Sequence, residues 1–167
     1  VVGDGAVGLL GILAARELGA ERIIAMSRHA DRQALAREFG ATDIVSERGD
    51  AGVARIKELT NGLGAHSVIE AVGTQESMMQ AIRSTRPGGH VGYVGVSHDV
   101  ALPGDELFFS GVHLHGGPAP VRRFLPELIQ LIWDREIDPG VVFDLTLPLE
   151  QAAGGYRAMD ERRATKV

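Results

Sequence analysis

The stretch Gly3-Asp4-Gly5-Ala6-Val7-Gly8 follows a short apolar stub, opens a helical pattern and has the spacing G-x-G-x-x-G. In such a turn the first glycine permits the tight bend, the second lets backbone amides approach a pyrophosphate, and the third lets the helix pack closely on the strand. The helix N-terminus adds free N–H groups and a partial positive charge. The motif predicts a dinucleotide-binding turn contacted through Gly3, Gly5, Ala6, Val7 and Gly8; the alternative is a purely structural strand-to-helix turn.

Outward from this turn, short β-branched runs alternate with helical segments, which is typical of a parallel sheet with helices on both faces. We predict an α/β Rossmann fold whose doubly wound sheet has six parallel strands in the order 3-2-1-4-5-6. The expected strands are the stub at residues 1–2 and residues 22–26, 43–45, 67–72, 90–96 and 111–115, with a turn at 87–89. The expected helices are residues 7–18, 31–39, 52–59, 75–83 and 121–135, with a helical turn at 103–109.

The chain is expected to contain two regions. Residues 1–140 form the dinucleotide-binding domain, and residues 141–167 add an extended segment at 141–147 and a last helix at 150–160. The first strand has only Val1 and Val2 before the turn, whereas strands usually have about five residues. Because a β-prone run also begins close to the other end, at residues 163–167, we expect the chain to be a fragment of a longer polypeptide.

The composition argues against several classes of function. The chain has no cysteine, so it has no disulfide, no thiolate metal site and no cysteine nucleophile. A net charge of -5 argues against a general nucleic-acid or anionic-membrane surface. The most apolar stretch, residues 6–15, is about half as long as a membrane span. We expect a cytoplasmic protein with small-molecule partners.

The end of the second predicted strand indicates which dinucleotide is bound. An NAD site normally has an acidic residue there, about 20 residues after the glycine turn, to bind the ribose hydroxyls. This chain has Ser27 and Arg28 instead, with Arg32 one helical turn further. A hydroxyl donor and two guanidinium groups suit a 2′-phosphate, so we predict NADP(H) rather than NAD(H). The alternative is that both arginines are solvated surface charges. We expect the nearby carboxylates Asp4 and Glu47 to point into solvent.

Three further strand ends carry glycine and meet the same edge of the predicted sheet. Ligands of open parallel sheets bind at the carboxyl ends of the strands, and glycine lets a ring or a ribose approach the backbone. An ordinary β-to-α turn is the alternative at each position. The predicted cofactor contacts here are Ala71, Val72 and Gly73, then Val94, Gly95 and Val96, and finally His115, Gly116 and Gly117.

Other chemistry-bearing residues are weaker candidates. His113 and His115 alternate on one face of a strand, as two metal ligands do, but no further ligand lies at suitable spacing. Glu70 lies inside an apolar strand and needs a hydrogen-bond partner, and a structural role is favoured over contact with substrate or cofactor. We predict no catalytic residue and no metal ligand in this chain. Surface or turn roles are expected for His66, His90 and His98.

The motifs occur in the order G-D-G-A-V-G, I-I-A-M-S-R, F-G-A-T-D-I-V, E-A-V-G-T, R-P-G-G-H-V-G-Y-V-G-V, P-V-R-R-F-L-P-E-L and L-P-L-E-Q-A-A-G-G-Y-R-A-M-D. This order resembles the coenzyme-binding domain of zinc-dependent alcohol dehydrogenases, in the medium-chain dehydrogenase/reductase superfamily. The resemblance covers nearly the whole chain. It implies that Val72 and Gly73 lie near the adenosine, and that residues 94–96 and 115–117 lie near the nicotinamide. Ser27 and Arg28 match the pair seen in NADP-preferring members.

The resemblance also implies an activity. It points to an oxidoreductase that moves hydride between NADP(H) and an alcohol, aldehyde or ketone. In that family zinc is held by a preceding catalytic domain, which is absent from this chain and toward which residues 141–167 would lead back. We therefore expect the isolated 167 residues to be inactive as an alcohol dehydrogenase. The resemblance further implies a homodimer through the edge strand Gly111 to His115.

Two related enzyme classes are disfavoured, and one alternative function stays open. A short-chain dehydrogenase needs Tyr-x-x-x-Lys, but Ser97 follows Tyr93 and Asp160 follows Tyr156 at that spacing. A methyltransferase usually has an acidic residue where Ser27 lies. The alternative is a non-catalytic NADP(H)-binding sensor or dimerisation module, and the sequence upstream of Val1 would distinguish it from an enzyme.

Overall fold

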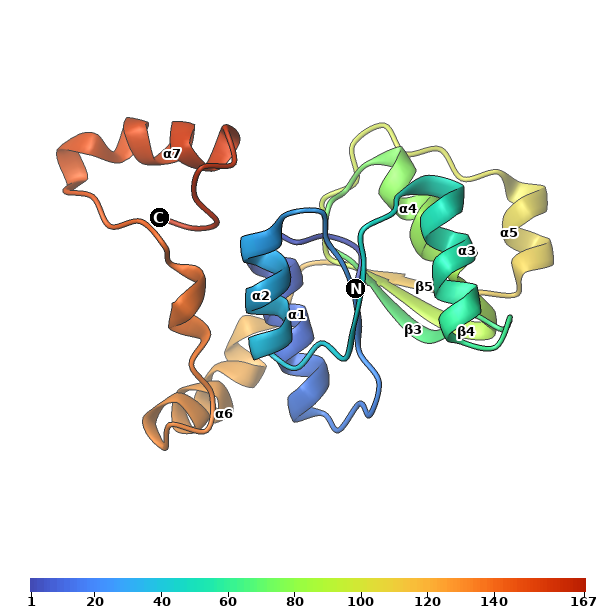
Figure 1. The fold of residues 1–167 in the computed structure, drawn as a ribbon, viewed down its shortest axis with the longest axis horizontal. Coiled ribbons are helices and arrows are strands. Elements are labelled where there is room, and N and C mark those ends of the chain that lie inside the picture. The colour runs from blue at the N-terminus through green and yellow to red at the C-terminus, as the bar shows by residue number, and fades with distance from the viewer. The chain divides into compact units, whose positions relative to one another are not determined.

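The computed structural model describes residues 1–167 (Figure 1). Contacts within the chain divide it into two compact units, Val1–Ala119 and Pro120–Val167. The expected division at residue 140 falls inside the second unit, and it stays a prediction about the whole protein. No helix is both long enough and apolar enough to cross a membrane.

The first unit is built on parallel strands, in the α/β arrangement that the sequence predicts. β1 (Ile24–Met26) pairs with β2 (Asp43–Val45). β4 (Thr85–Tyr93) lies between β3 (Ala65–Glu70) and β5 (His113–Gly116). Val2 makes isolated parallel bridges to Met26 and Glu70. The expected first strand is therefore present as one bridging residue between two sheet sections, and the complete six-stranded order stays a prediction.

The helices of the first unit follow the predicted alternation, with boundaries that differ from the prediction by up to three residues. They are α1 (Ala6–Glu17), α2 (Ala30–Glu38), α3 (Gly49–Leu59), α4 (Gln75–Ser84) and α5 (Gly104–Ser110). Thr74 starts α4 with a capping box, in which its side chain accepts from the Ser77 amide and the Ser77 side chain accepts from the Thr74 amide. The prediction of a turn at residues 87–89 was wrong. These residues lie inside β4, at the point where its register with β3 shifts.

The core of the first unit lies between the strands and the helices α3 and α4. α4 packs against β3 and β4, and α3 packs against α4 and β2. Figure 1 shows both helices beside the sheet section formed by β3, β4 and β5. The buried core cluster has no aromatic ring and consists of Val2, Met26, Val45, Ile56, Val68, Met78, Met79, Ala81, Ile82 and Val91.

The second unit is helical and irregular. It contains α6 (Val121–Trp133), η1 (Pro139–Val142), η2 (Leu149–Gln151) and α7 (Ala152–Asp160). The extended segment expected from residue 141 is therefore shortened by η1, and the expected last helix begins with the turn η2. Burial tends to raise the pKa of Asp144, but hydrogen bonds from the backbone amides of Thr165 and Lys166 outweigh it and hold that pKa below its ordinary value of 3.8.

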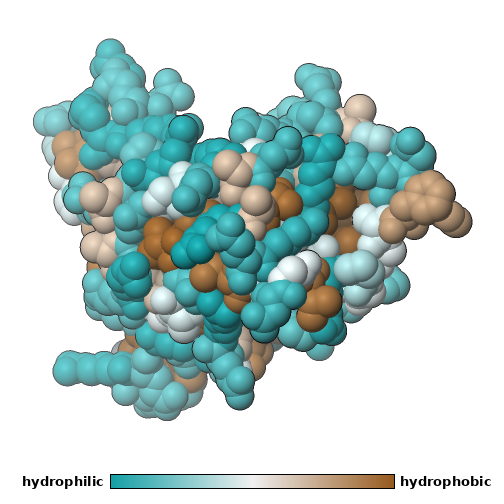
Figure 2. All heavy atoms as spheres, turned by 45° about the vertical axis from the view of Figure 1, so that its right-hand side comes forward, coloured by the Kyte–Doolittle hydropathy of each residue, from teal (hydrophilic) through white to brown (hydrophobic).

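Several large apolar side chains are exposed. They include Phe108 and Phe109 of α5 and, in the second unit, Phe124, Ile129 and Trp133 of α6, a helix that has no buried residue. Figure 2 shows exposed hydrophobic groups as separate patches on a mostly hydrophilic face. Single exposed apolar groups are normal on protein surfaces. The exposed apolar side chains of α6, in contrast, recur along the whole helix and also include Val121, Leu125, Leu128 and Ile132.

Candidate functional site

The glycine turn leaves one of its three glycines open to a ligand. Gly3 has a φ of +117°, a conformation that favours glycine. A Cβ on Gly8 would lie 2.1 Å from the carbonyl oxygen of Gly3, so the start of α1 packs directly on the turn. A Cβ on Gly5 would meet no atom within 4 Å. Gly5 is also the N-cap of α1 and no side chain caps it, so the N–H groups of the first helical turn are free to bind an anion.

The ends of β3 and β4 are in direct backbone contact through two of the predicted glycines. Gly73 has a φ of +88°, and a Cβ on it would lie 2.5 Å from the carbonyl oxygen of Val96. A Cβ on Gly95 would lie 2.5 Å from the amide nitrogen of Gly73. Glycine is therefore required here by the contact between the two strand ends, whether or not a ligand binds.

Glu70 accepts hydrogen bonds from the backbone of both strand ends. The residue is fully buried, and its Oε1 accepts hydrogen bonds from the amides of Val72 and Gly73 at 2.8 Å each. Its carbonyl oxygen accepts from the Val94 amide at 2.9 Å and from the Gly95 amide at 3.3 Å. The prediction that Glu70 has a hydrogen-bond partner is confirmed, although its Oε2 has none.

Four valines are exposed at the strand ends around the glycine turn. Val7, Val72, Val94 and Val96 are between 42% and 73% exposed. A Cβ on Gly3 would lie 2.9 Å from Val72 Cγ2, and Ala71 lies against Gly8, so the β3 end is adjacent to the turn. These exposed valines give the carboxyl edge of the sheet an uncovered apolar surface beside the uncapped N-terminus of α1. All four belong to the residues predicted to contact a cofactor.

Asp4 does not point into solvent, and that expectation was wrong. Its side chain is buried, accepts a hydrogen bond from Ser27 Oγ at 2.8 Å on Oδ2, and pairs with Arg32 Nη1 at 3.3 Å through Oδ1. Glu47 is exposed, as predicted. Arg28 is exposed and makes no ion pair. Of the groups predicted to bind a 2′-phosphate, Ser27 and Arg32 are therefore already bonded to a carboxylate.

Asp4 is negatively charged at neutral pH. Burial tends to raise its pKa, but the hydrogen bond from Ser27 and the positive charges of Arg32 and His29 outweigh that effect. The pKa of Asp4 consequently lies below its ordinary value of 3.8. The corner between the glycine turn and β1 thus contains a buried anion that is compensated by Arg32.

Comparison with known proteins decides which family shares this arrangement. The profile of the family described as zinc-binding dehydrogenase matches residues 6–134. The chain belongs to the zinc-binding dehydrogenase family. Its predicted resemblance to the coenzyme-binding domain of zinc-type alcohol dehydrogenases is thereby confirmed.

Relatives of this zinc-binding dehydrogenase chain are considerably longer than the chain itself. A probable zinc-binding alcohol dehydrogenase of Mycobacterium tuberculosis is 41% identical, with a match that covers 100% of this chain and 43% of the relative. An NADP-dependent isopropanol dehydrogenase of Clostridium beijerinckii is 35% identical over 78% of this chain and 38% of its own length. The structure of an alcohol dehydrogenase from Thermus sp. ATN1 matches 98% of this chain and 48% of its own, with 32% identity and a TM-score of 0.87. The chain spans less than half the length of these proteins and shares their Rossmann-like fold.

β5 and the neighbouring strand β4 bring together three histidines, of which the sequence analysis paired only His113 and His115. His115 Nε2 lies 3.2 Å from His90 Nδ1, and the His90 ring stacks on those of His113 and His115. His90 was missed because it belongs to a different strand, and its pairing with His113 in the β4–β5 register was the only signal. No group of three or more metal-ligating side chains in the chain is arranged to hold a metal ion. Next to His115, Gly116 faces the Tyr93 ring, whereas Gly117 has open space.

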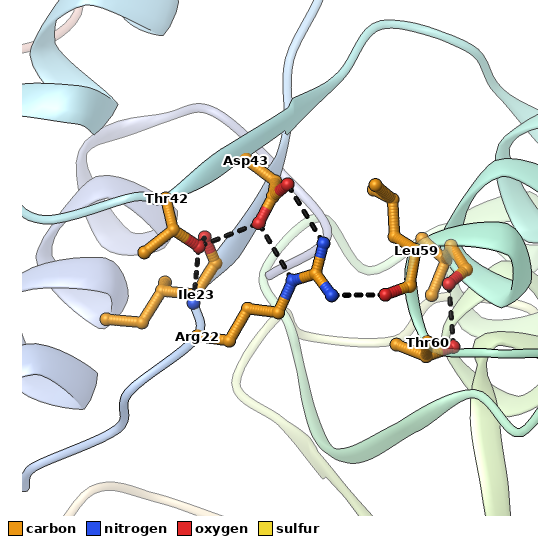
Figure 3. Close-up of polar contacts among 7 residues, drawn as sticks. Arg22, Ile23, Thr42, Asp43, Leu59 and Thr60 are labelled. Atoms are coloured by element: carbon orange, nitrogen blue, oxygen red, sulfur yellow. Dashed lines mark hydrogen bonds and ion pairs between the residues drawn. The ribbon is translucent and has the colours of Figure 1, made fainter.

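A cavity of about 630 Å³ lies at the opposite, amino ends of the strands. Figure 3 shows part of its wall, where Arg22 donates to the Asp43 carboxylate at 2.9 Å and to the carbonyl oxygen of Leu59. Because dinucleotides bind at the carboxyl ends of parallel strands, this cavity is not the candidate cofactor site of the zinc-binding dehydrogenase chain.

Proposed function

We propose that this chain is the NADP(H)-binding domain of an oxidoreductase that transfers hydride between the nicotinamide and an alcohol or carbonyl substrate. The observation that carries the proposal is the open Gly5 at the uncapped N-terminus of α1, beside the exposed valines of the strand ends. The proposed contacts are those predicted from the sequence, except that Ser27 and Arg32 are already bonded to Asp4. Gly5 and the first amides of α1 lie at the pyrophosphate in this proposal. A non-catalytic NADP(H)-binding sensor or dimerisation module is the alternative.

The residues present fit a dinucleotide. Free amides and the partial positive charge of α1 suit the pyrophosphate, and Val72, Val94 and Val96 offer apolar contacts to its rings and riboses. The nicotinamide supplies the hydride acceptor or donor when it is bound, while this chain binds and orients it. No cluster of residues here fits zinc, and we propose that a zinc site belongs to a catalytic domain outside this chain.

The preference for NADP(H) is the first testable part of the proposal. Arg28 is an exposed guanidinium just after the end of β1. Three relatives are named NADP-dependent isopropanol dehydrogenases, from Clostridium beijerinckii, Entamoeba histolytica and Thermoanaerobacter brockii. We expect the full-length protein to bind NADPH at least about tenfold more tightly than NADH, since a guanidinium pairs strongly with a phosphate. Fluorescence titration gives both dissociation constants, and equal values, or tighter NADH, would contradict the assignment.

The isolated 167-residue chain is expected to show no alcohol oxidation. In this proposal the chain binds the cofactor, but the groups that activate the substrate oxygen belong to the catalytic domain. The measurement is NADPH formation from a panel of primary and secondary alcohols with added zinc, with the full-length protein as the control. Zinc-dependent turnover by the isolated chain would show that the substrate site lies within it. Activity of neither protein would favour the sensor alternative.

Other parts of the proposal concern the whole protein. We propose a cytoplasmic homodimer that pairs through the edge strand, expected at residues Gly111 to His115 and found as β5 (His113–Gly116), because Gly111 ends α5. We further propose a dinucleotide-binding domain over residues 1–140, with residues 141–167 leading back to the catalytic domain. We also propose that residues upstream of Val1 complete the first strand, giving the sheet order 3-2-1-4-5-6. The isolated bridges of Val2 to Met26 and Glu70 support that order.

A further inference from the structure

Asp4 is the one carboxylate within the glycine turn, and it lies in the corner where the proposed 2′-phosphate would bind. Its side chain is only 9% exposed. The carboxylate bonds to Ser27 through Oδ2 and to Arg32 through Oδ1. One buried acid thus holds two of the three groups that the sequence connects with phosphate binding.

Ser27 has no hydrogen to offer to a phosphate in this arrangement. A hydroxyl carries one hydrogen, and Ser27 Oγ donates its hydrogen to Asp4 Oδ2, with 2.8 Å between the two oxygens in a buried hydrogen bond. Ser27 Oγ also accepts a hydrogen bond from the His29 amide at 3.3 Å. Ser27 therefore links the glycine turn to the start of α2 and is not a free donor.

Arg32 has its charge compensated in the same way. Its side chain is 13% exposed, and its Nη1 lies 3.3 Å from Asp4 Oδ1. A phosphate in this corner would meet an arginine and an aspartate whose charges cancel. Arg28, next to Ser27, is exposed and unpaired, so it is the one uncompensated guanidinium here.

We propose that Asp4 sets the cofactor preference of this site by neutralising Arg32 and holding the Ser27 hydroxyl, so that Arg28 alone binds the 2′-phosphate of NADP(H). The inference rests on the proposed function, because it concerns the same dinucleotide. Asp4 is a positioning residue in this account and touches no cofactor. The preference for NADPH over NADH is therefore weaker than it would be if Ser27, Arg28 and Arg32 were all free to bind the 2′-phosphate. Removing the negative charge of Asp4 strengthens that preference.

A charge-rescue experiment in the full-length protein tests the proposal. Dissociation constants for NADPH and NADH are measured for the wild type, Asp4→Asn, Arg32→Met and the double variant. Asp4→Asn is expected to raise NADPH affinity about tenfold, Arg32→Met to lower it about tenfold, and the double variant to return it to within about twofold of the wild type. NADH affinity should change less than about twofold throughout, since NADH lacks the 2′-phosphate. Arg28→Ala should lower NADPH affinity at least about tenfold.

Controls separate this reading from a purely structural role for Asp4. Arg37→Met, at an exposed position of the same helix, should leave the NADPH-to-NADH ratio unchanged. Thermal unfolding checks that each variant folds, and Asp4→Ser replaces Asp4→Asn if the latter does not. A double variant as weak as Arg32→Met would show that Arg32 binds the phosphate directly, and an unchanged ratio in Asp4→Asn would equally overturn the inference. A wild type without NADPH preference contradicts the proposed function itself.

Discussion

The Gly8→Ala variant is expected to lose about 3 kcal/mol or more of folding stability, because its new Cβ would overlap well-packed backbone. That Cβ would lie 2.1 Å from the Gly3 oxygen and 2.8 Å from the Gly3 carbonyl carbon. Neither backbone atom moves unless the turn separates from α1. The free energy of unfolding in urea, and the loss of NADPH binding that follows, are the measurements.

Gly5→Ala is the matched control in the same turn. Gly5 has a φ of -77°, which alanine adopts freely, and its Cβ would meet no atom within 4 Å. Stability should therefore change by less than about 0.5 kcal/mol, as at an open surface position. NADPH affinity should nevertheless fall at least about tenfold, since the methyl group occupies the space where a pyrophosphate approaches the amides. Unchanged affinity in Gly5→Ala would place the dinucleotide elsewhere.

Glu70→Ala is expected to cost about 2–4 kcal/mol, because it leaves two amides without their acceptor at a largely buried position. The amides are those of Val72 and Gly73, which Oε1 binds at 2.8 Å. Loss of these bonds should also loosen the ends of β3 and β4 and weaken NADPH binding about tenfold, since both ends carry proposed cofactor contacts. Urea unfolding and the NADPH dissociation constant are measured together.

Glu70→Gln distinguishes the hydrogen bonds from the charge. The amide oxygen of glutamine accepts both backbone bonds, so we expect a loss of about 1 kcal/mol and near-normal NADPH affinity. The amide NH2 of glutamine takes the position of Oε2, which has no hydrogen-bond partner in the wild type, so the substitution breaks no existing hydrogen bond. If Glu70→Gln were as defective as Glu70→Ala, the negative charge of Glu70, and not its acceptor geometry, would hold the two strand ends.

The sequence predicted the parts of the site that depend on neighbouring residues. The turn from Gly3 to Gly8 was predictable because its glycines and the helix after it are contiguous. The alternation of strands and helices was likewise a local signal, and it placed the helices of the first unit within three residues of their observed ends.

Contacts between distant parts of the chain were not predictable in this way. Asp4 is separated from Ser27 by 23 residues and from Arg32 by 28, so its orientation depends on how β1 and α2 pack beside the turn. Burial of a lone carboxylate is costly, and only the partners supplied by that packing make it favourable. The stacking of His90 on His113 was not predictable for the same reason, because it depends on the register of β4 against β5.

The backbone contact between Gly73 and Gly95 also limits how this domain can be engineered or recombined with its relatives. Each strand end fills the space that a side chain on the other would need. A loop graft that replaces one strand end with a non-glycine sequence would force the other to move. Glu70 would then lose its hydrogen bonds to the amides of these strand ends. Loops that are exchanged at these two strand ends should therefore be transplanted as a pair, together with Glu70.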